Sequence, residues 1–176
     1  HLGSAILLTR PFGGNIENCW FSQHPNAAVY LGSNTDTRAV IRNCVFLAPD
    51  SFSDENGWAV YTYQKTHISN NTIVGPGLGA GFTPSAMYIG YNTYAEQGQF
   101  VNNIFVDTER AIQVYVGVDM PIKYNQFYNV TDIVCQGDNY LGNNIAWLEL
   151  LLDNFRNNDS GAPLFFPSGS PYQIKP

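Results

Sequence analysis

The sequence predicts an all-β solenoid, in which successive turns of the chain stack on one another. Three observations carry this prediction: a tyrosine that returns within a repeated strand, an asparagine-rich corner that returns out of step with it, and short β-branched or aromatic stretches after the corners. The spacing of both repeats, close to 27 residues in several intervals, suits one coil per repeat.

The tyrosine repeat defines one strand of each coil. Its copies read Ala28-Val29-Tyr30-Leu31-Gly32, Ala59-Val60-Tyr61-Thr62-Tyr63, Ala86-Met87-Tyr88-Ile89-Gly90 and Gln113-Val114-Tyr115-Val116-Gly117. Successive tyrosines lie 31, 27 and 27 residues apart, and Cys135 takes the tyrosine's place after 20 more. Because apolar residues alternate with the tyrosines, as Ile112, Val114 and Val116 do, we expect the apolar side chains to point inward and the tyrosines outward.

The corner repeat has the form Ile-x-Asn-Asn. Its last position falls at Cys19, Cys44, Asn71, Asn103, Asn125 and Asn144, at intervals of 25, 27, 32, 22 and 19 residues. Asparagine adopts a left-handed backbone readily, and its amide can bond an identical amide one strand spacing of about 4.8 Å away. We therefore expect an asparagine ladder that turns the chain and joins the coils, with insertions of varying length elsewhere in each coil.

The period changes after the last corner. Apolar residues recur at helical spacing at Trp147, Leu148, Leu151, Leu152 and Phe155, and a polar stretch at 157–161 ends the pattern. We expect one domain with coils over residues 1–146 and a capping helix and extended tail over 147–176. The first coil has no such cover, because a strand begins at once near Ala5, and we expect it to be available for self-association.

These features resemble the right-handed parallel β-helix family, which includes pectate lyases, related polysaccharide lyases and epimerases, and phage tailspikes. The resemblance runs from about Ile16 to Ile145 and implies a right-handed solenoid of about five to six coils with a short C-terminal helix and tail. The segment from Trp147 to the C-terminus looks like the closing part of secreted bacterial members. The family specifies the fold rather than an activity, since the same coil carries lyases, hydrolases, epimerases and inert stalks.

Composition narrows the classes of partner. Only 12% of the residues are charged, the net charge is -6, and the eight basic residues are scattered, which argues against nucleic acid. No stretch approaches the roughly 20 apolar residues of a membrane helix, so we expect no membrane insertion. We expect a secreted or cell-surface protein. The chain lacks an initiator methionine, which suggests a processed protein or an excised piece of a longer one; a dedicated short protein is the alternative.

The cysteines and acids give no metal motif. Cys19 and Cys44 occupy one position on adjacent coils, where two stacked, buried thiols are favoured over a disulfide, and Cys135 is expected in the core. Nothing has metal-ligand spacing, and we expect no metal or other cofactor. The acidic loop at 50–57 offers oxygen ligands to calcium, but its spacing fits no EF-hand.

The tyrosine strand is the main candidate for ligand binding. Tyr30, Tyr61, Tyr88 and Tyr115, widened by Tyr63, would form an aromatic strip on which the rings of a linear polysaccharide could stack. The alternative is that the tyrosines stack on one another and stabilise neighbouring coils.

Charged residues beside these strands are weaker candidates for catalysis. Asp107, Glu109 and Arg110 precede one tyrosine strand, and Lys65 follows another. Lyases resembling this fold abstract a proton with an arginine or lysine, a role open to Arg110 or Lys65. Hydrolases use paired carboxylates, for which Asp107, Glu109 and Asp119 are the available set. A surface salt-bridge network explains the same residues.

Three functions remain open from the sequence. The favoured one is a secreted carbohydrate-interacting β-helix, either a glycan-binding module or an enzyme such as a polysaccharide lyase or glycoside hydrolase. The alternatives are a structural solenoid that assembles end to end into a fibre, stalk or surface layer, and a coil of a phage tail fibre.

Overall fold

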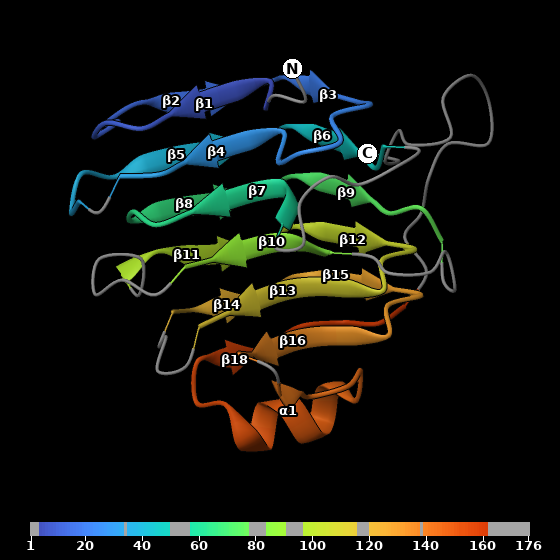
Figure 1. Cartoon of the computed structure of the whole chain (residues 1–176). Coiled ribbons are helices and arrows are strands. Elements are labelled where there is room, and N and C mark those ends of the chain that lie inside the picture. Colours follow the sequence, from blue (N-terminus) through green and yellow to red (C-terminus); the bar gives the residue numbers. More distant parts are fainter. Residues whose placement is uncertain are drawn as a thin grey trace.

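A computed structural model of the chain forms a solenoid whose coils each contribute one strand to three parallel sheets (Figure 1). The structure describes residues 4–33, 35–49, 57–77, 84–90, 97–115, 120–137 and 139–161. The acidic loop at 50–56, Asp119 and the tail at 162–176 lie outside the described residues. The predicted all-β fold is confirmed, with five complete coils and a sixth, partial one within the described residues.

Each sheet takes every third strand of the solenoid. Sheet A contains β1 (Ile6–Leu8), β4 (Val29–Leu31), β7 (Gly57–Thr62), β10 (Ser85–Ile89), β13 (Arg110–Val114), β16 (Asp132–Gln136) and the antiparallel β17 (Asn139–Tyr140). Sheet B contains β2 (Asn15–Glu17), β5 (Ala39–Arg42), β8 (Thr66–Ser69), β11 (Gln99–Val101), β14 (Ile122–Lys123) and β18 (Phe155–Arg156). Sheet C contains β3 (Trp20–Phe21), β6 (Val45–Leu47), β9 (Thr72–Val74), β12 (Ile104–Val106) and β15 (Gln126–Tyr128).

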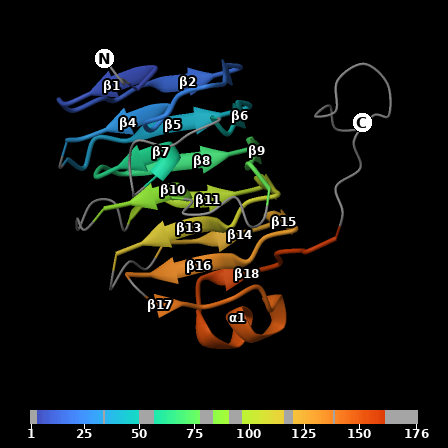
Figure 2. The same ribbon diagram turned by 45° about the vertical axis from the view of Figure 1, so that its right-hand side comes forward.

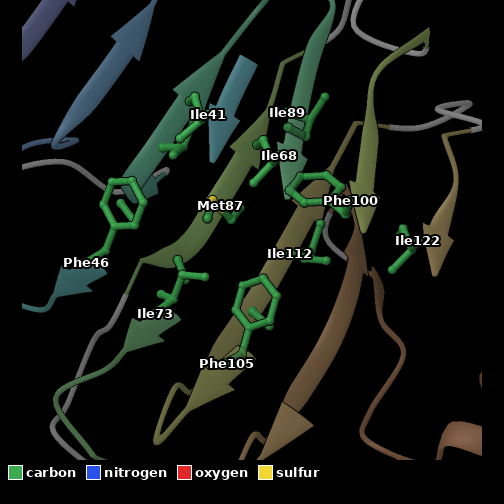
Figure 3. Packing of buried hydrophobic residues seen from close by; sticks show 14 of the residues in the cluster. Ile41, Phe46, Ile68, Ile73, Met87, Ile89, Phe100, Phe105, Ile112 and Ile122 are labelled. Atoms are coloured by element: carbon green, nitrogen blue, oxygen red, sulfur yellow. The ribbon is translucent and has the colours of Figure 1, made fainter. Parts of the chain in front are cut away.

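The core fills the space that the three sheets enclose. Figure 3 shows Ile68 and Phe100 of sheet B, Met87 and Ile112 of sheet A, and Phe105 of sheet C around one interior, and all five side chains are fully buried. Side chains alternate along each strand, so the apolar partners of the tyrosines point inward as predicted. Aromatic rings also stack from coil to coil, because equivalent residues lie one strand spacing apart.

The asparagine ladder joins the coils at the corner between sheets B and C. The Asn71 Nδ2 donates to Asn103 Oδ1 at 3.0 Å, and Asn103 Nδ2 donates to Asn125 Oδ1 at 3.0 Å. The Asn125 Nδ2 donates to Asn158 Oδ1 at 3.1 Å. Each Oδ1 also accepts the backbone N–H of the preceding rung, with Cys44 as the first. The ladder thus satisfies the polar groups of a buried corner.

The turn and the ladder bond, which the sequence analysis assigned to one asparagine, belong to two neighbouring residues. The residue before each rung turns the chain, with a left-handed φ of 54° at Asn70 and 57° at Asn102. The prediction that Asn144 forms the last rung is wrong, because Asn158 occupies it. Asn144 instead caps a helix, accepting the backbone N–H of Trp147 at 3.0 Å.

That helix, α1 (Ile145–Leu151), closes the end of the solenoid opposite the N-terminus (Figures 1 and 2). It inserts Leu148 fully into the core, and β18 then returns the chain to sheet B beside β14. The helix therefore shields the last coil from solvent. At the other end, β1, β2 and β3 each pair on one side only within the described part of the chain.

The three cysteines are free thiols. The Cys44 Sγ donates to the Arg42 carbonyl oxygen at 3.2 Å, and burial raises the pKa of the Cys44 thiol to about 11. Burial likewise raises the pKa of Cys135 to about 12. These thiols pack as small apolar groups, the interpretation that the sequence favoured.

Candidate functional site

The register of sheet A lines up three of the predicted tyrosines. Tyr30 pairs with Tyr61, and Tyr61 pairs with Tyr88, so these three residues form one outward column across neighbouring coils. The next residues in this column are Gln113 and Cys135. The prediction that Tyr115 continues the column is wrong by two residues.

The three aligned tyrosines form a stack, called the tyrosine stack below. The ring centroids of Tyr30 and Tyr61 lie 4.8 Å apart with an interplanar angle of 16°, and those of Tyr61 and Tyr88 lie 4.6 Å apart at 21°. Ring separation therefore matches the strand spacing of about 4.8 Å. The faces of the central ring are occupied by its neighbours, and Tyr61 is only 6% exposed.

Tyr63 braces the stack from the side. Its ring meets that of Tyr61 edge-on, with centroids 5.2 Å apart, and the two hydroxyl oxygens lie 2.5 Å apart. Burial, together with this hydrogen bond, raises the pKa of Tyr61. Tyr61 is thus a buried structural residue rather than an exposed stacking platform, which corrects the expectation that all the tyrosines are exposed together.

A second outward column runs beside the stack and contains Gly32, Tyr63, Gly90 and Tyr115. The backbone N–H of Tyr115 donates to the Ile89 carbonyl oxygen at 3.2 Å, which places it next to Gly90. A Cβ on Gly90 would overlap the ring of Tyr63, so glycine at this position leaves room for that ring. Tyr115 is 45% exposed, the most exposed of the five tyrosines.

Neutral polar groups continue this face beyond the stack. The Ser85 Oγ donates to Gln113 Oε1 at 2.9 Å, and Gln113 Nε2 donates to the Gly137 carbonyl oxygen at 3.4 Å. Sequence reasoning missed both residues, although Gln113 lies 25 residues after Tyr88 and could have been found as an alternative register. The result is a rigid face of rings, phenol hydroxyls and an amide, which are groups that bind uncharged polar ligands.

Three of the proposed catalytic residues lie where the chain enters sheet A. Asp107 turns the corner with a φ of 53°, and its Oδ1 accepts a hydrogen bond from Asn129 Nδ2 at 2.6 Å. The Glu109 Oε2 is buried and has no hydrogen-bond partner among the described residues. Arg110 begins β13 in register with Asp132, and its guanidinium carbon lies 4.9 Å from the ring centroid of Tyr140.

Lys65 lies at the other end of the sheet A strands. It follows β7, and its Nζ donates to Gln97 Oε1 at 3.3 Å. Because the strands are parallel, Lys65 is separated from Arg110 by the length of the sheet. Among the described residues, no group of three or more His, Cys, Asp or Glu residues could hold a metal ion.

Two hollows lie away from the tyrosine face. One, of about 410 Å³, is bordered by Phe127, Asn129, Thr131 and Asn143 at the corner between sheets C and A. The other, of about 300 Å³, lies over Asn70 and Asn102 at the ladder corner. Neither hollow is lined by a predicted site residue.

Comparison with known proteins identifies the family but no close relative. A family model for the right handed beta helix region matches residues 4–172. Neither the curated proteins nor the solved structures gave a match. Within the described residues, no helix is long and apolar enough to cross a membrane. The stacked parallel strands and this match agree, and the chain belongs to the right-handed β-helix family.

Proposed function

We propose that the outer face of sheet A binds a linear polysaccharide. The observation that carries the proposal is the tyrosine stack with its side column, an ordered row of aromatic and hydroxyl groups that follows the axis of the solenoid. The β-helix fold of this family is often associated with carbohydrates, which supports the same ligand class.

The parts of this face take different roles in the proposal. Tyr115 offers ring surface to a sugar, since it is the most exposed of these tyrosines. Tyr30 and Tyr88 contribute ring edges and hydroxyl groups, because a face of each ring packs on Tyr61. The stack fixes these side chains before the ligand arrives, which reduces the conformational entropy that binding would cost.

Binding without chemistry is the form of the proposal that the geometry supports best. The lyase-like candidates Arg110 and Lys65 lie at opposite ends of the sheet, and the Asp107 carboxylate is engaged by Asn129. General acid–base catalysis requires groups within hydrogen-bond reach of one reacting centre. The proposed residues do not converge on such a centre, so we assign the face to recognition.

The first experiment incubates the protein with plant, algal and animal polysaccharides, with and without calcium, and measures retention and ultraviolet absorbance. Retention without growth in absorbance is the expected result. Absorbance that grows with time would indicate unsaturated uronate products, establish a lyase and return attention to Arg110 and Lys65. Absence of retention on every polysaccharide would contradict the proposal.

Point variants then locate the binding face. Tyr115→Ala removes exposed ring surface and is expected to weaken retention, whereas Tyr88→Phe removes one hydroxyl and leaves the stack intact. Tyr128→Ala is the matched control, because Tyr128 is 40% exposed but lies on sheet C. Equal losses from Tyr115→Ala and Tyr128→Ala would place the binding surface elsewhere.

A second candidate function is self-association through the first coil. Leu7 is 59% exposed and Trp20 is 55% exposed there, and the adjoining strands have unpaired edges within the described residues. Because α1 covers the opposite end, this arrangement favours a closed dimer over an end-to-end fibre. Light scattering tests it: a monomer at micromolar concentration would exclude it.

A further inference from the structure

Three basic side chains gather at the corner between sheets A and B. Ala39 is in register with Thr66, so Arg38 and Lys65 lie side by side on adjacent coils, and the Ala39 N–H donates to the Lys65 carbonyl oxygen at 3.0 Å. The inward side chains of this corner, Ala39 and Thr66, are buried. Side chains alternate along a strand, and Arg38, Lys65 and His67 therefore face outward together.

The two permanent cations of this corner, Arg38 and Lys65, have no ionic partner within the described part of the chain. The ion pairs there join Arg42 to Glu17 and Arg156 to Asp153. Lys65 Nζ instead donates to an amide oxygen of Gln97, and the His67 Nδ1 lies 3.3 Å from the Gln99 amide nitrogen.

The local charge is unusual for this molecule. The chain has a net charge of -6 and eight lysines and arginines in all, yet two of these eight meet here beside a histidine. Burial lowers the pKa of His67, and the nearby positive charges of Arg38 and Lys65 lower it further. Uncompensated positive charge in one place attracts an anion.

The corner is also rigid and adjoins the tyrosine face. Gln64 is fully buried, and its Nε2 donates to the Phe12 carbonyl oxygen at 2.8 Å and the Thr37 carbonyl oxygen at 3.3 Å, which ties three coils together. Lys65 follows directly, two residues after Tyr63. A substituent of a glycan lying on the tyrosine face would reach the cations at this corner.

We infer that Arg38, Lys65 and His67 form a subsite for one oxyanion, the carboxylate or sulfate group of an acidic glycan. The inference rests on the proposed glycan-binding function and names the ligand class of that face. Arginine offers a planar fork of donors to an oxyanion, and lysine adds a mobile point charge. The net charge of -6 disfavours polyanions overall, so the proposed attraction depends on the positive charge of this corner.

The test uses three ligands with one backbone: dextran, carboxymethyl-dextran and dextran sulfate. We expect retention of the charged forms over neutral dextran, falling as salt rises. Comparing retention of carboxymethyl-dextran with that of dextran sulfate shows whether the subsite prefers a carboxylate or a sulfate group. Equal retention of all three ligands, or retention of none, would overturn the inference.

Charge-matched variants locate the site. Arg38→Gln and Lys65→Gln should each weaken retention of the charged dextrans by about ten-fold, the loss of one charge-assisted hydrogen bond. Lys123→Gln changes the net charge equally but lies on β14, two strands from β8 in sheet B, and it should leave retention unchanged. Equal losses of retention from Lys65→Gln and Lys123→Gln would show that the effect comes from the net charge of the protein, and would overturn the inferred subsite.

The two proposals fail in different ways. Retention of neutral polysaccharides that depends on Tyr115, without preference for charged dextrans, would leave the binding face standing and remove the anion subsite. Retention of charged dextrans that depends on Lys65 but not on Tyr115 would support the subsite and contradict the tyrosine face.

Discussion

Replacing Asn103 by alanine tests how the coils are joined. The Asn103 amide makes four hydrogen bonds: Nδ2 donates to Asn125 Oδ1 and to the Ile68 carbonyl oxygen, each at 3.0 Å, and Oδ1 accepts from the Asn71 amide at 3.0 Å and the Asn71 backbone N–H at 3.1 Å. The Asn103 side chain is fully buried. Alanine would leave these partner groups away from water with no replacement.

The expected cost follows from these four bonds. A net contribution of about 1 kcal/mol per bond predicts a loss of about 4 kcal/mol in the free energy of unfolding. Domains of this size are stable by only about 5 to 15 kcal/mol, so the variant should unfold at a much lower urea concentration.

Urea unfolding followed by tryptophan fluorescence and circular dichroism measures the change. Asn102→Gly is the matched control, since Asn102 is exposed and has a φ of 57°, which glycine adopts without strain. Among the described residues it loses the exposed 2.6 Å side-chain bond to Asn70, and the expected change is below about 1 kcal/mol. A loss below about 1 kcal/mol for Asn103→Ala, or an equal loss for Asn102→Gly, would refute the reasoning.

Two further predictions concern titratable groups. Because burial raises the pKa of Cys44 to about 11 and that of Cys135 to about 12, a thiol reagent at pH 8 should label at most Cys19 in the folded protein and three thiols after unfolding. Labelling of two thiols in the folded state contradicts this, and a single thiol after unfolding would reveal a bridge between Cys19 and Cys44. The pKa of His67 is lowered by burial below its ordinary value of 6.5, so the unfolded chain binds that proton first as pH falls. The free energy of unfolding should therefore decrease as pH falls below about 6.5, and His67→Gln should flatten that part of the profile; an unchanged slope would exclude the histidine.

Much of the fold could be predicted from the spacing of a few residues. The Ile-x-Asn-Asn corners recur because each coil must turn at the same place, and a buried amide there satisfies both its own groups and its neighbour's. The last rung escaped prediction for a physical reason. The helix α1 is inserted before the final corner, so Asn158 forms the rung while Asn144 caps the helix.

The candidate site was predicted less well. Alternation shows which face of the sheet a side chain lies on, but it does not show which residue of the neighbouring strand it pairs with. A slip of two residues keeps every side chain on its side of the sheet, and the pattern around Tyr115 therefore fits either register. Backbone pairing places Gln113 opposite Tyr88 and moves Tyr115 beside Gly90. Similarly, the meeting of Arg38 and Lys65 depends on coil-to-coil register, which loop insertions of varying length conceal in the sequence.

A map of the glycan footprint by amide chemical shifts would test the central claim most directly. The best-retained polysaccharide, cut to a soluble oligosaccharide, would be titrated into isotopically labelled protein. The account predicts shifts concentrated on the outer face of sheet A, around Tyr88, Gln113 and Tyr115, with sheet C unchanged. Shifts confined to sheet C or to the ladder corner would contradict it.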